Sequence, residues 1–367
     1  MTGSSRDKFL SAIPGQKSAK ELLRKAIESE RLSSAYLLRG PAGTGKFAAA
    51  LELARFMKCD SQEKCGGECK SCVLMRNLDH PDLQVIIPLP REISESPEAT
   101  SQELRLAASN PFAKLSYEKP ANIPIDTGRE LSGKLSLAPT SDGGRWAIIR
   151  DADMMNAEAS NAFLKTLEEP PDDAHIILTS SRPDFLLPTI RSRTQPVRFV
   201  RLSRVELEAF LTEKGVDESK AKEISITADG SISAALEEIK GERKETRALG
   251  EELWVALFSK SDPLALDLAD KLGDNRSLAL EIIESAISFL CDQILAQQGL
   301  GNLIRNIGSK TRIESAAQKF PNSKPVGMAL RFLQDRAFVL RFNPQYDLFW
   351  MDLILRGRNI IREGGVE

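Results

Sequence analysis

Four of the five cysteines in this chain lie within residues 59–72, a spacing that suits a metal site. They are Cys59, Cys65, Cys69 and Cys72. Four thiolates form a closed, tetrahedral structural zinc site, and Gly66-Gly67 lets the backbone turn around the ion. Clustered cysteines in a chain without an export signal also argue for a metal rather than for disulfides. We therefore expect one structural zinc ion; the alternative is a set of buried thiols that bind nothing.

The remaining cysteine and the two histidines offer little further chemistry. Cys291 lies in an apolar helical stretch and is expected to pack in a core. His80 is close to the cysteines, but four sulfur atoms already complete a zinc shell, so we interpret it as structural. Because His80 and His175 are the only histidines, catalysis by histidine has little material to use.

The stretch Gly40-Pro-Ala-Gly-Thr-Gly45-Lys46 has the pattern of a phosphate-binding loop. It stands between an expected strand at 35–38 and an expected helix, which is the context such a loop requires. The glycines expose backbone N–H groups, the helix N-terminus adds partial positive charge, and the lysine reaches the outer phosphates. The alternative is a glycine-rich turn with an incidental lysine. The predicted binding residues are Gly40, Gly43, Thr44, Gly45 and Lys46.

The residue after the lysine changes this interpretation. A site that hydrolyses ATP has Ser or Thr there, because the hydroxyl binds Mg²⁺. This chain has Phe47, whose side chain offers no oxygen. The motif therefore predicts a nucleotide site that lacks one of its metal ligands.

Short apolar runs at 35–38, 146–149 and 175–179 predict the strands that would position this loop. Their alternation with helical stretches up to about residue 200 predicts an α/β fold in which helices cover a parallel sheet. Between the last two runs we expect a helix over 159–169. Asn156 is its expected N-cap and Pro170-Pro171 ends it.

The pattern changes after residue 200. Residues 201–240 predict a small helical domain, and residues 241–367 predict an all-helical domain. The amphipathic segments of the latter are 249–258, 263–272, 278–298, 326–341 and 346–362. Within the first domain, 1–200, residues 88–124 are rich in Pro, Ser and Glu and are expected to be an insertion that is partly loop.

The composition is that of an ordinary globular protein of 367 residues, with 41% hydrophobic and 28% charged residues. The net charge of -2 gives no overall attraction to nucleic acid. No apolar run approaches the ~20 residues that cross a bilayer, and the first residues lack the apolar core of a secretory signal. We therefore expect a cytoplasmic protein.

Three stretches carry a resemblance to a known family. They are Asn161-Ala-Phe-Leu-Lys-Thr-Leu-Glu-Glu-Pro-Pro171, the preceding Asp-Ala-Asp-Met-Met-Asn, and Leu187-Pro-Thr-Ile-Arg-Ser-Arg193. Together they resemble the clamp-loader branch of the AAA+ ATPases, and the four-cysteine insertion after the phosphate-loop helix resembles the bacterial DNA polymerase III clamp loader. The resemblance covers about residues 10–240. It implies an AAA+ P-loop domain with a zinc module, then a helical lid and an all-α collar domain for oligomerisation.

The resemblance also implies that positions needed for hydrolysis are altered. Arg150 stands where the family has its magnesium-binding Asp, and Asp151 stands at the catalytic acid. Ser233 stands at the sensor-2 arginine. A guanidinium repels Mg²⁺, so together with Phe47 these residues imply no Mg²⁺ site and no hydrolysis. Binding of ATP or ADP is left open.

Ser192-Arg193 matches the family's Ser-Arg-Cys motif, with Thr194 in place of the cysteine. In that family the arginine enters a neighbouring subunit's ATP site, where its planar fork stabilises charge on the transferring phosphoryl group. Arg193 is therefore the one expected catalytic residue, and it would act in trans. The alternatives are that Arg193 caps a helix or pairs with Asp184.

The resemblance is greatest to the member of the ring that does not hydrolyse ATP. It implies as partners the other clamp-loader subunits (gamma/tau and delta), the sliding clamp, and primed DNA through the assembly, with no membrane. One alternative is an ATP-hydrolysing gamma/tau-type subunit, which an ATPase assay distinguishes. The other is a stand-alone zinc-containing DNA-binding protein, which predicts a basic face and salt-dependent binding.

Overall fold

The computed structural model describes residues 9–61, 65, 67–241, 243–259, 262–273, 276–340 and 344–363. The chain divides into two compact units, Met1–Leu115 with Ala121–Leu236, and Ser116–Pro120 with Glu237–Glu367. In the part of the chain so described, no helix combines the length and the apolar character needed to cross a membrane. The finer division at residues 200 and 240 stays a prediction.

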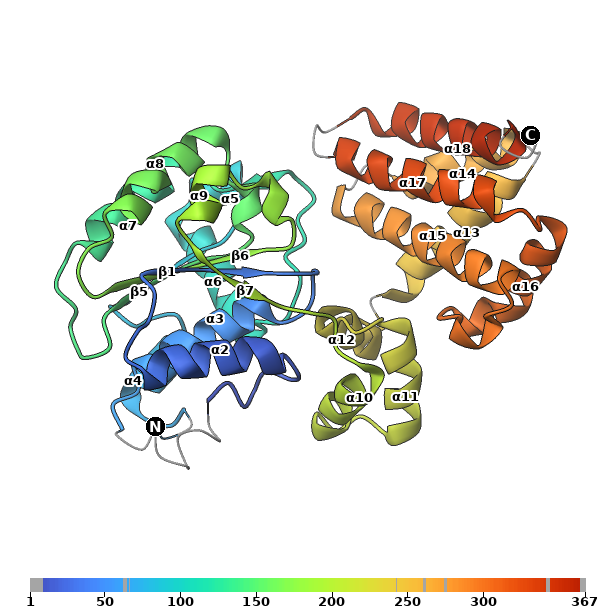
Figure 1. The fold of residues 1–367 in the computed structure, drawn as a ribbon. Helices are drawn as coiled ribbons and strands as arrows, with labels where there is room; N and C mark the ends of the chain where they lie inside the picture. Colours follow the sequence, from blue (N-terminus) through green and yellow to red (C-terminus); the bar gives the residue numbers. More distant parts are fainter. Residues whose placement is uncertain are drawn as a thin grey trace. The chain divides into compact units, whose positions relative to one another are not determined.

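The first unit is built on a five-stranded parallel sheet, which confirms the predicted α/β fold (Figure 1). Its strand order is β2 (Leu83–Ile86), β5 (Arg145–Ile149), β6 (Ala174–Ser180), β1 (Ala35–Arg39) and β7 (Gln195–Arg198). The three predicted strands are β1, β5 and β6, each one or two residues longer than expected. Sequence analysis missed β2 and β7, the two short edge strands.

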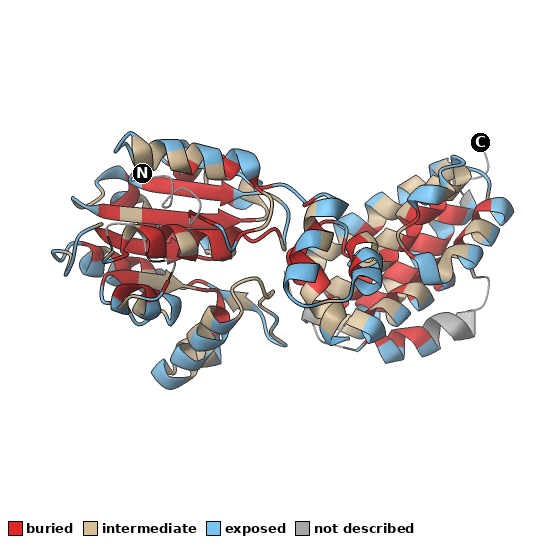
Figure 2. Cartoon of the chain, turned by 90° about the horizontal axis from the view of Figure 1, so that it is seen from below, coloured by how far each residue is buried: buried red, intermediate tan, exposed pale blue. Residues whose placement is uncertain are grey.

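Helices cover both faces of this sheet, and this explains why its strands are apolar without alternation. Helices α7 (Ile125–Leu135) and α8 (Ala157–Glu168) lie on one face, and α2 (Lys17–Glu28) and α3 (Lys46–Met57) on the other (Figure 1). Alternate strand residues pack beneath α7 and α8, for example Leu37 against a cluster that includes Phe163. Figure 2 shows the strands almost wholly buried.

The residues expected to begin and end α8 do so. The Asn156 side chain accepts a hydrogen bond from Ala159 N at 2.7 Å, which begins the helix two residues earlier than predicted. The helix ends at Glu168, directly before Glu169 and the two prolines.

The insertion at 88–124 holds more regular structure than expected. Its elements are β3 (Leu89–Pro90), α5 (Arg91–Ser94), α6 (Pro97–Ser109) and β4 (Ala121–Asn122). Ser96 caps α6 by accepting a hydrogen bond from Ala99 N, and Pro97 occupies the first helical turn, where proline needs no N–H partner. Proline therefore begins a helix here, whereas the sequence analysis took proline as a sign of loop. The chain from Asn110 to Leu115 is irregular.

Three helices follow β7, and the last of them runs into the second unit. They are α10 (Arg204–Glu213), α11 (Glu218–Thr227) and α12 (Ile232–Lys240). They lie in the segment expected to form a lid, and we refer to them as the lid. Ser203 and Glu206 form a reciprocal capping box at the start of α10. Ile232 N donates a hydrogen bond to Gly43 O at 2.8 Å, so the first residue of α12 contacts the phosphate loop directly.

The second unit is all-helical, as the amphipathic segments predict. Its helices are α13 (Arg243–Phe258), α14 (Asp262–Leu272), α15 (Arg276–Gln297), α16 (Lys310–Lys319), α17 (Ser323–Val339) and α18 (Tyr346–Glu363). Sequence analysis missed α16, whose sequence is mostly polar and buries only Ile313 and Ala317. In the core, Trp254 stacks on Phe289 with ring centroids 5.4 Å apart.

A buried ion pair ties the end of α3 to the edge of the sheet. Lys58 Nζ lies 2.7 Å from Asp82 Oδ2, and both side chains are fully buried. Lys58 also donates to the carbonyls of Ser141 and Gly144, and Asp82 accepts from the N–H and hydroxyl of Thr140. Burial acts to raise the pKa of Asp82, but Lys58 and Thr140 lower it to about 2.

We predict that Asp82→Asn lowers the free energy of unfolding by about 3 kcal/mol at pH 7, because it leaves the Lys58 ammonium buried without a counter-charge. Since the folded pKa of Asp82 is below its ordinary value, this contribution is present above pH ~4 and is lost as the pH falls toward 2. Urea unfolding of both proteins between pH 2 and pH 7 measures it. Asp184→Asn, which removes a partner of Arg191 from an exposed pair, is the control and should change stability by less than about 0.5 kcal/mol. Equal stability of Asp82→Asn and the unaltered protein at pH 7 would contradict the prediction.

Candidate functional site

The phosphate loop joins β1 to α3 at the carboxyl end of the sheet, as the motif requires. Gly40, Gly43 and Gly45 have φ values of 149°, 74° and 84°, which only glycine adopts readily. A Cβ atom at Gly40 would lie 2.1 Å from Phe199 O, and one at Gly43 would lie 2.0 Å from Ser231 Oγ. The glycines are therefore required both by the turn and by the close approach of Phe199 and Ser231.

Lys46 lies at the start of α3 and is buried. Its Nζ donates to Gly40 O at 2.8 Å and to Pro41 O at 2.7 Å, and Thr44 Oγ1 donates to Pro41 O at 2.9 Å. Burial lowers the pKa of Lys46 to about 8. The loop therefore holds its own lysine, and a bound phosphate would have to compete with two carbonyl oxygens for it.

The positions that differ from an ATPase lie beside this loop. Phe47 is buried in the first turn of α3, and the Arg150 guanidinium lies over its ring, 4.7 Å from the centroid. Arg150 also donates to the carbonyl of Ala113 and lies 3.6 Å from an oxygen of Asp151. Ser233 Oγ donates to the carbonyl of Phe112. Both carbonyls belong to the irregular segment of the insertion.

A neighbouring polar cluster was not found by sequence analysis. The buried carboxylate of Asp153 accepts a hydrogen bond from Ser180 Oγ at 2.7 Å and lies 3.3 Å from Arg182 Nε. Nearby, Asp151 N donates to Thr179 Oγ1 at 3.0 Å. These contacts connect the ends of β5 and β6. The two residues in each of these contacts are 27 to 29 positions apart in the sequence. No short-range sequence pattern could therefore predict the contacts.

Arg193 follows α9 (Pro188–Ser192) and lies at the surface, with 36% of its side chain exposed. Its Nη2 lies 2.8 Å from Glu168 Oε1, and its Nη1 donates to Thr189 O at 3.2 Å. It is thus the capping residue of α9, one of the alternatives considered. Asp184, the other alternative, pairs instead with Arg191 at 2.9 Å.

The four clustered cysteines come together as predicted. Their sulfur atoms all lie within 4.8 Å of one another. The Sγ distances from Cys59 to Cys65 and from Cys65 to Cys72 are 3.6 and 3.9 Å. Zn–S bonds of about 2.3 Å at tetrahedral angles place sulfur atoms about 3.8 Å apart, whereas a disulfide needs about 2.05 Å. The donor set therefore fits one zinc ion and does not fit disulfides.

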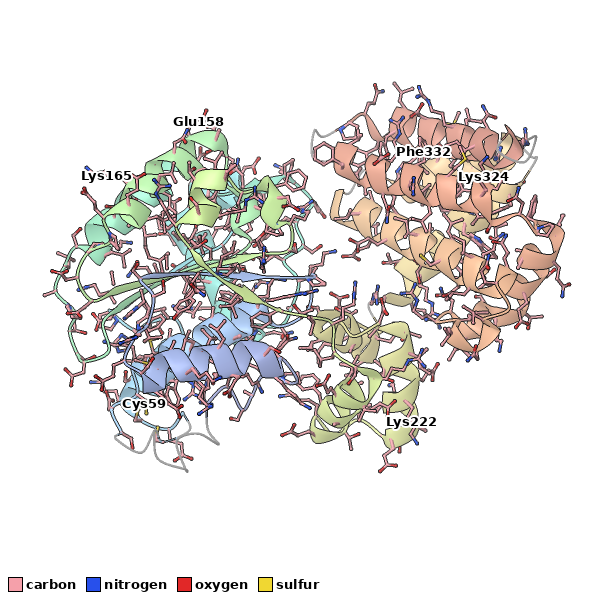
Figure 3. The ribbon with its side chains drawn as sticks, in the orientation of Figure 1. Cys59, Glu158, Lys165, Lys222, Lys324 and Phe332 are labelled. Atoms are coloured by element: carbon pink, nitrogen blue, oxygen red, sulfur yellow. The ribbon has the colours of Figure 1, made fainter. Side chains whose placement is uncertain are left out.

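The surroundings of the sulfur atoms shift the pKa values of two of the thiols in opposite directions. Burial acts to raise the pKa of the Cys65 thiol, but the N–H groups of Cys69, Gly67 and Glu68 lower it to about 6. Burial and the neighbouring Cys69 raise the pKa of the Cys72 thiol, although Arg55 Nη1, 3.5 Å from Cys72 Sγ, acts to lower it. Figure 3 labels Cys59 within this cluster, near α4 (Lys70–Arg76), whose first residue follows Cys69. Gly66, to which sequence analysis gave the turn, lies outside the described residues.

The histidine next to the cluster is structural, as expected. His80 is buried, and its Nδ1 accepts from Asp82 N at 3.1 Å while its Nε2 lies 3.0 Å from Ser71 Oγ. Ser71 in turn donates to Lys58 O at 2.6 Å. His80 thus joins the cysteine module to the Lys58–Asp82 pair. Cys291 is half-buried in α15, far along the chain from the cluster.

The parallel sheet, the glycine loop after β1 and the lysine that begins α3 define a P-loop α/β protein in which Phe47 follows that lysine. A family model described as "DNA polymerase III, delta subunit" matches residues 15–203. The chain belongs to this family, the delta' subunits of the DNA polymerase III clamp loader.

Curated relatives agree with this assignment. The delta' subunit of Bacillus subtilis is 32% identical over 65% of this chain and 64% of its own length. That of Pseudomonas aeruginosa is 36% identical over 43% of this chain and 40% of its own length. The tau subunit of Bacillus subtilis is 27% identical over 61% of this chain and 36% of its own length. The matched region therefore spans less than two thirds of these relatives.

Among solved structures, a DNA polymerase III gamma subunit-related protein from Thermotoga maritima matches at 20% identity with a TM-score of 0.41. The match covers 95% of this chain and 100% of that chain. A TM-score at this level supports no conclusion about the fold beyond the sheet order described above.

We predict that the freshly purified chain contains one zinc ion, because its four sulfur atoms already have tetrahedral spacing. Elemental analysis measures the stoichiometry. Cys59→Ser should reduce the zinc content to less than half and lower the melting temperature, because metal binding contributes directly to folding. Cys291→Ser is the matched control and should keep both. Well under one zinc per unaltered chain would contradict the prediction.

Proposed function

We propose that this chain is the non-hydrolysing delta' subunit of the DNA polymerase III holoenzyme's clamp loader. In this role it helps the ATP-dependent loading of the sliding clamp onto primed DNA during replication. The proposal rests on the family match together with Phe47 and Arg150, which we take to stand at the two positions that would hold Mg²⁺. A cytoplasmic location goes with this role.

The absence of hydrolysis follows from the chemistry of these two side chains. Mg²⁺ requires oxygen ligands and bridges the outer phosphates in P-loop ATPases. Phe47 supplies no oxygen, and the Arg150 guanidinium, 4.7 Å from the Phe47 ring centroid, brings a positive charge to the same place. Electrostatic repulsion of the ion therefore adds to the loss of its ligands.

Arg193 gives this chain a role in the reaction of a neighbour. We infer that it leaves Glu168 and enters an adjacent subunit's ATP site, where its guanidinium stabilises charge on the transferring phosphoryl group. Its exposure supports this, because an exposed ion pair is worth only about 0–1 kcal/mol and is readily exchanged for a more favourable partner.

The other parts of the chain receive roles consistent with this assembly. One zinc ion bound by Cys59, Cys65, Cys69 and Cys72 would stabilise its module. Residues 201–240 would form the lid, and residues 241–367 the collar through which the chain joins gamma/tau and delta subunits. Contact with the clamp and with primed DNA would come through the ring.

An ATP-hydrolysing gamma/tau-type subunit is the second candidate. The similarity to the tau subunit of Bacillus subtilis favours it. The two oxygen ligands that such a subunit requires are replaced in this chain, so we prefer the first assignment.

We predict that the isolated protein releases no phosphate from ATP above background, because both protein ligands for Mg²⁺ are missing. Phe47→Thr alone should not restore activity, because Arg150 still repels the ion. Phosphate release is the measurement, and Lys46→Ala identifies any contaminating ATPase, whose activity it would not change. Turnover of about 1 per second that Lys46→Ala abolishes would establish the gamma/tau-type function instead.

We also predict that Arg193→Ala leaves the reconstituted clamp loader assembled but lowers its DNA-stimulated ATPase and its rate of clamp loading. A trans-acting arginine is worth about 10³ or more at the one site it serves, so other sites in the ring keep part of the total rate. Arg193→Lys should rescue little, because an ammonium lacks the planar fork.

Arg191→Ala is the matched control for Arg193. Arg191 is two residues away, equally exposed and also paired with a carboxylate. It should leave loading and ATPase unchanged. Normal activity of the complex that carries Arg193→Ala would show that Arg193 only caps α9.

A further inference from the structure

The irregular segment Pro111–Ala113 lies against the nucleotide site. The ring of Phe112 would be 3.1 Å from a Cβ atom built on Gly45, so it lies in direct contact with the phosphate loop. The same ring packs edge-on against Phe210 of the lid, with centroids 5.8 Å apart. One side chain of the insertion therefore contacts both parts of the protein that enclose a nucleotide in a P-loop enzyme.

The backbone of this segment is held by two of the altered residues. Arg150 donates to the carbonyl of Ala113, and Ser233 donates to the carbonyl of Phe112. The third altered residue, Phe47, supports the Arg150 guanidinium with its ring. The substitutions that remove Mg²⁺ and the sensor arginine thus form one set of contacts to residues 112 and 113.

The phosphate loop is closed in the same arrangement. Lys46 binds the carbonyls of Gly40 and Pro41, and the amide of Ile232 in the lid binds Gly43 O at 2.8 Å. In a P-loop enzyme the bound nucleotide contacts both the loop and the lid. In this chain the loop and the lid contact each other directly, through the hydrogen bond from Ile232 N to Gly43 O.

We propose that Pro111–Ala113 is a built-in occupant of the nucleotide site, which keeps nucleotide out and holds the lid on the phosphate loop. This gives a role to an insertion that the activity of the clamp loader does not explain. It rests on the proposed function only in that Phe47, Arg150 and Ser233 are taken as positions of a lost hydrolytic site.

Binding of a fluorescent ADP, N-methylanthraniloyl-ADP, to the full-length chain tests the proposal. Fluorescence anisotropy is measured with and without Mg²⁺. The unaltered protein should bind at least about tenfold more weakly than a variant in which Pro111, Phe112 and Ala113 are all Gly, because an occupied site binds in proportion to its open fraction. Phe112→Ala should bind with intermediate affinity. Adding Lys46→Ala to the triple variant should abolish the gain.

Leu106→Ala is the matched control. Leu106 is an exposed apolar residue of α6 in the same insertion, and its change should leave ADP binding as weak as in the unaltered protein. If the unaltered protein binds the probe as tightly as the triple variant, the proposal is wrong. It is also wrong if the triple variant melts cooperatively and still binds no more tightly than the unaltered chain.

Hydrogen–deuterium exchange of the unaltered protein provides a test that needs no variant. The amides of residues 43–47 and 112–113 should be protected together without nucleotide, and millimolar ADP should not change them. Fast exchange of 112–113, as in an open loop, would overturn the proposal even if the variants failed to fold. Hydrolysis is measured separately, as phosphate release from ATP. Phosphate release by the unaltered chain would refute the proposed function. Tight ADP binding without hydrolysis would refute only the proposal that Pro111–Ala113 occupies the nucleotide site.

Discussion

The Arg150 guanidinium is the constraint on which the nucleotide region depends. It stands directly after β5, is 94% buried, and carries a charge that burial makes costly unless it is compensated. Its partners are the Phe47 ring, the carbonyl of Ala113 and the neighbouring Asp151. An arginine at this place therefore needs an apolar ring in α3 and a carbonyl oxygen from the insertion. The position of the 110–115 segment follows from that need.

The cysteine module depends on a second buried charge. Lys58 directly precedes Cys59, and its pairing with Asp82 fixes the point where the chain leaves α3 for the segment that holds the four cysteines. Ser71, between Cys69 and Cys72, is bonded both to Lys58 O and to His80. These contacts connect the cysteine-bearing segment to the edge of the sheet and so help to hold the four sulfur atoms in place. The sulfur atoms therefore lie close together before an ion binds.

Arg150 and Arg193 differ in how far each side chain is buried. Arg150 is buried and is bonded to the carbonyl of Ala113 within its own unit, which suits a structural role. Arg193 is partly exposed, and its contact to Glu168 is of the kind that costs little to break. The same side chain chemistry therefore serves a fixed contact at one site and an available one at the other. Burial decides which.

The sequence alone determined the features that depend on local chemistry. Apolar runs identified β1, β5 and β6, and Asn156 identified the start of α8, because burial on both faces and capping act within a few residues. The phosphate-loop pattern identified Lys46 at the start of α3, and the cysteine spacing identified four sulfur atoms that come together, for the same reason. Sequence analysis missed the short edge strands β2 and β7 and the polar helix α16. These elements bury few side chains, so their hydrophobic periodicity is weak.

Only the tertiary structure decided what the altered residues do. From the sequence, Phe47, Arg150 and Ser233 are interpreted as losses of groups that hydrolysis would need. Arg150 and Ser233 bind a segment up to 121 residues away along the chain, and no local pattern predicts such pairings. The contact of Phe112 with Gly45 likewise depends on how the insertion folds back over the sheet. The chemistry of single residues is local, whereas their pairing is set by the packing of the whole unit.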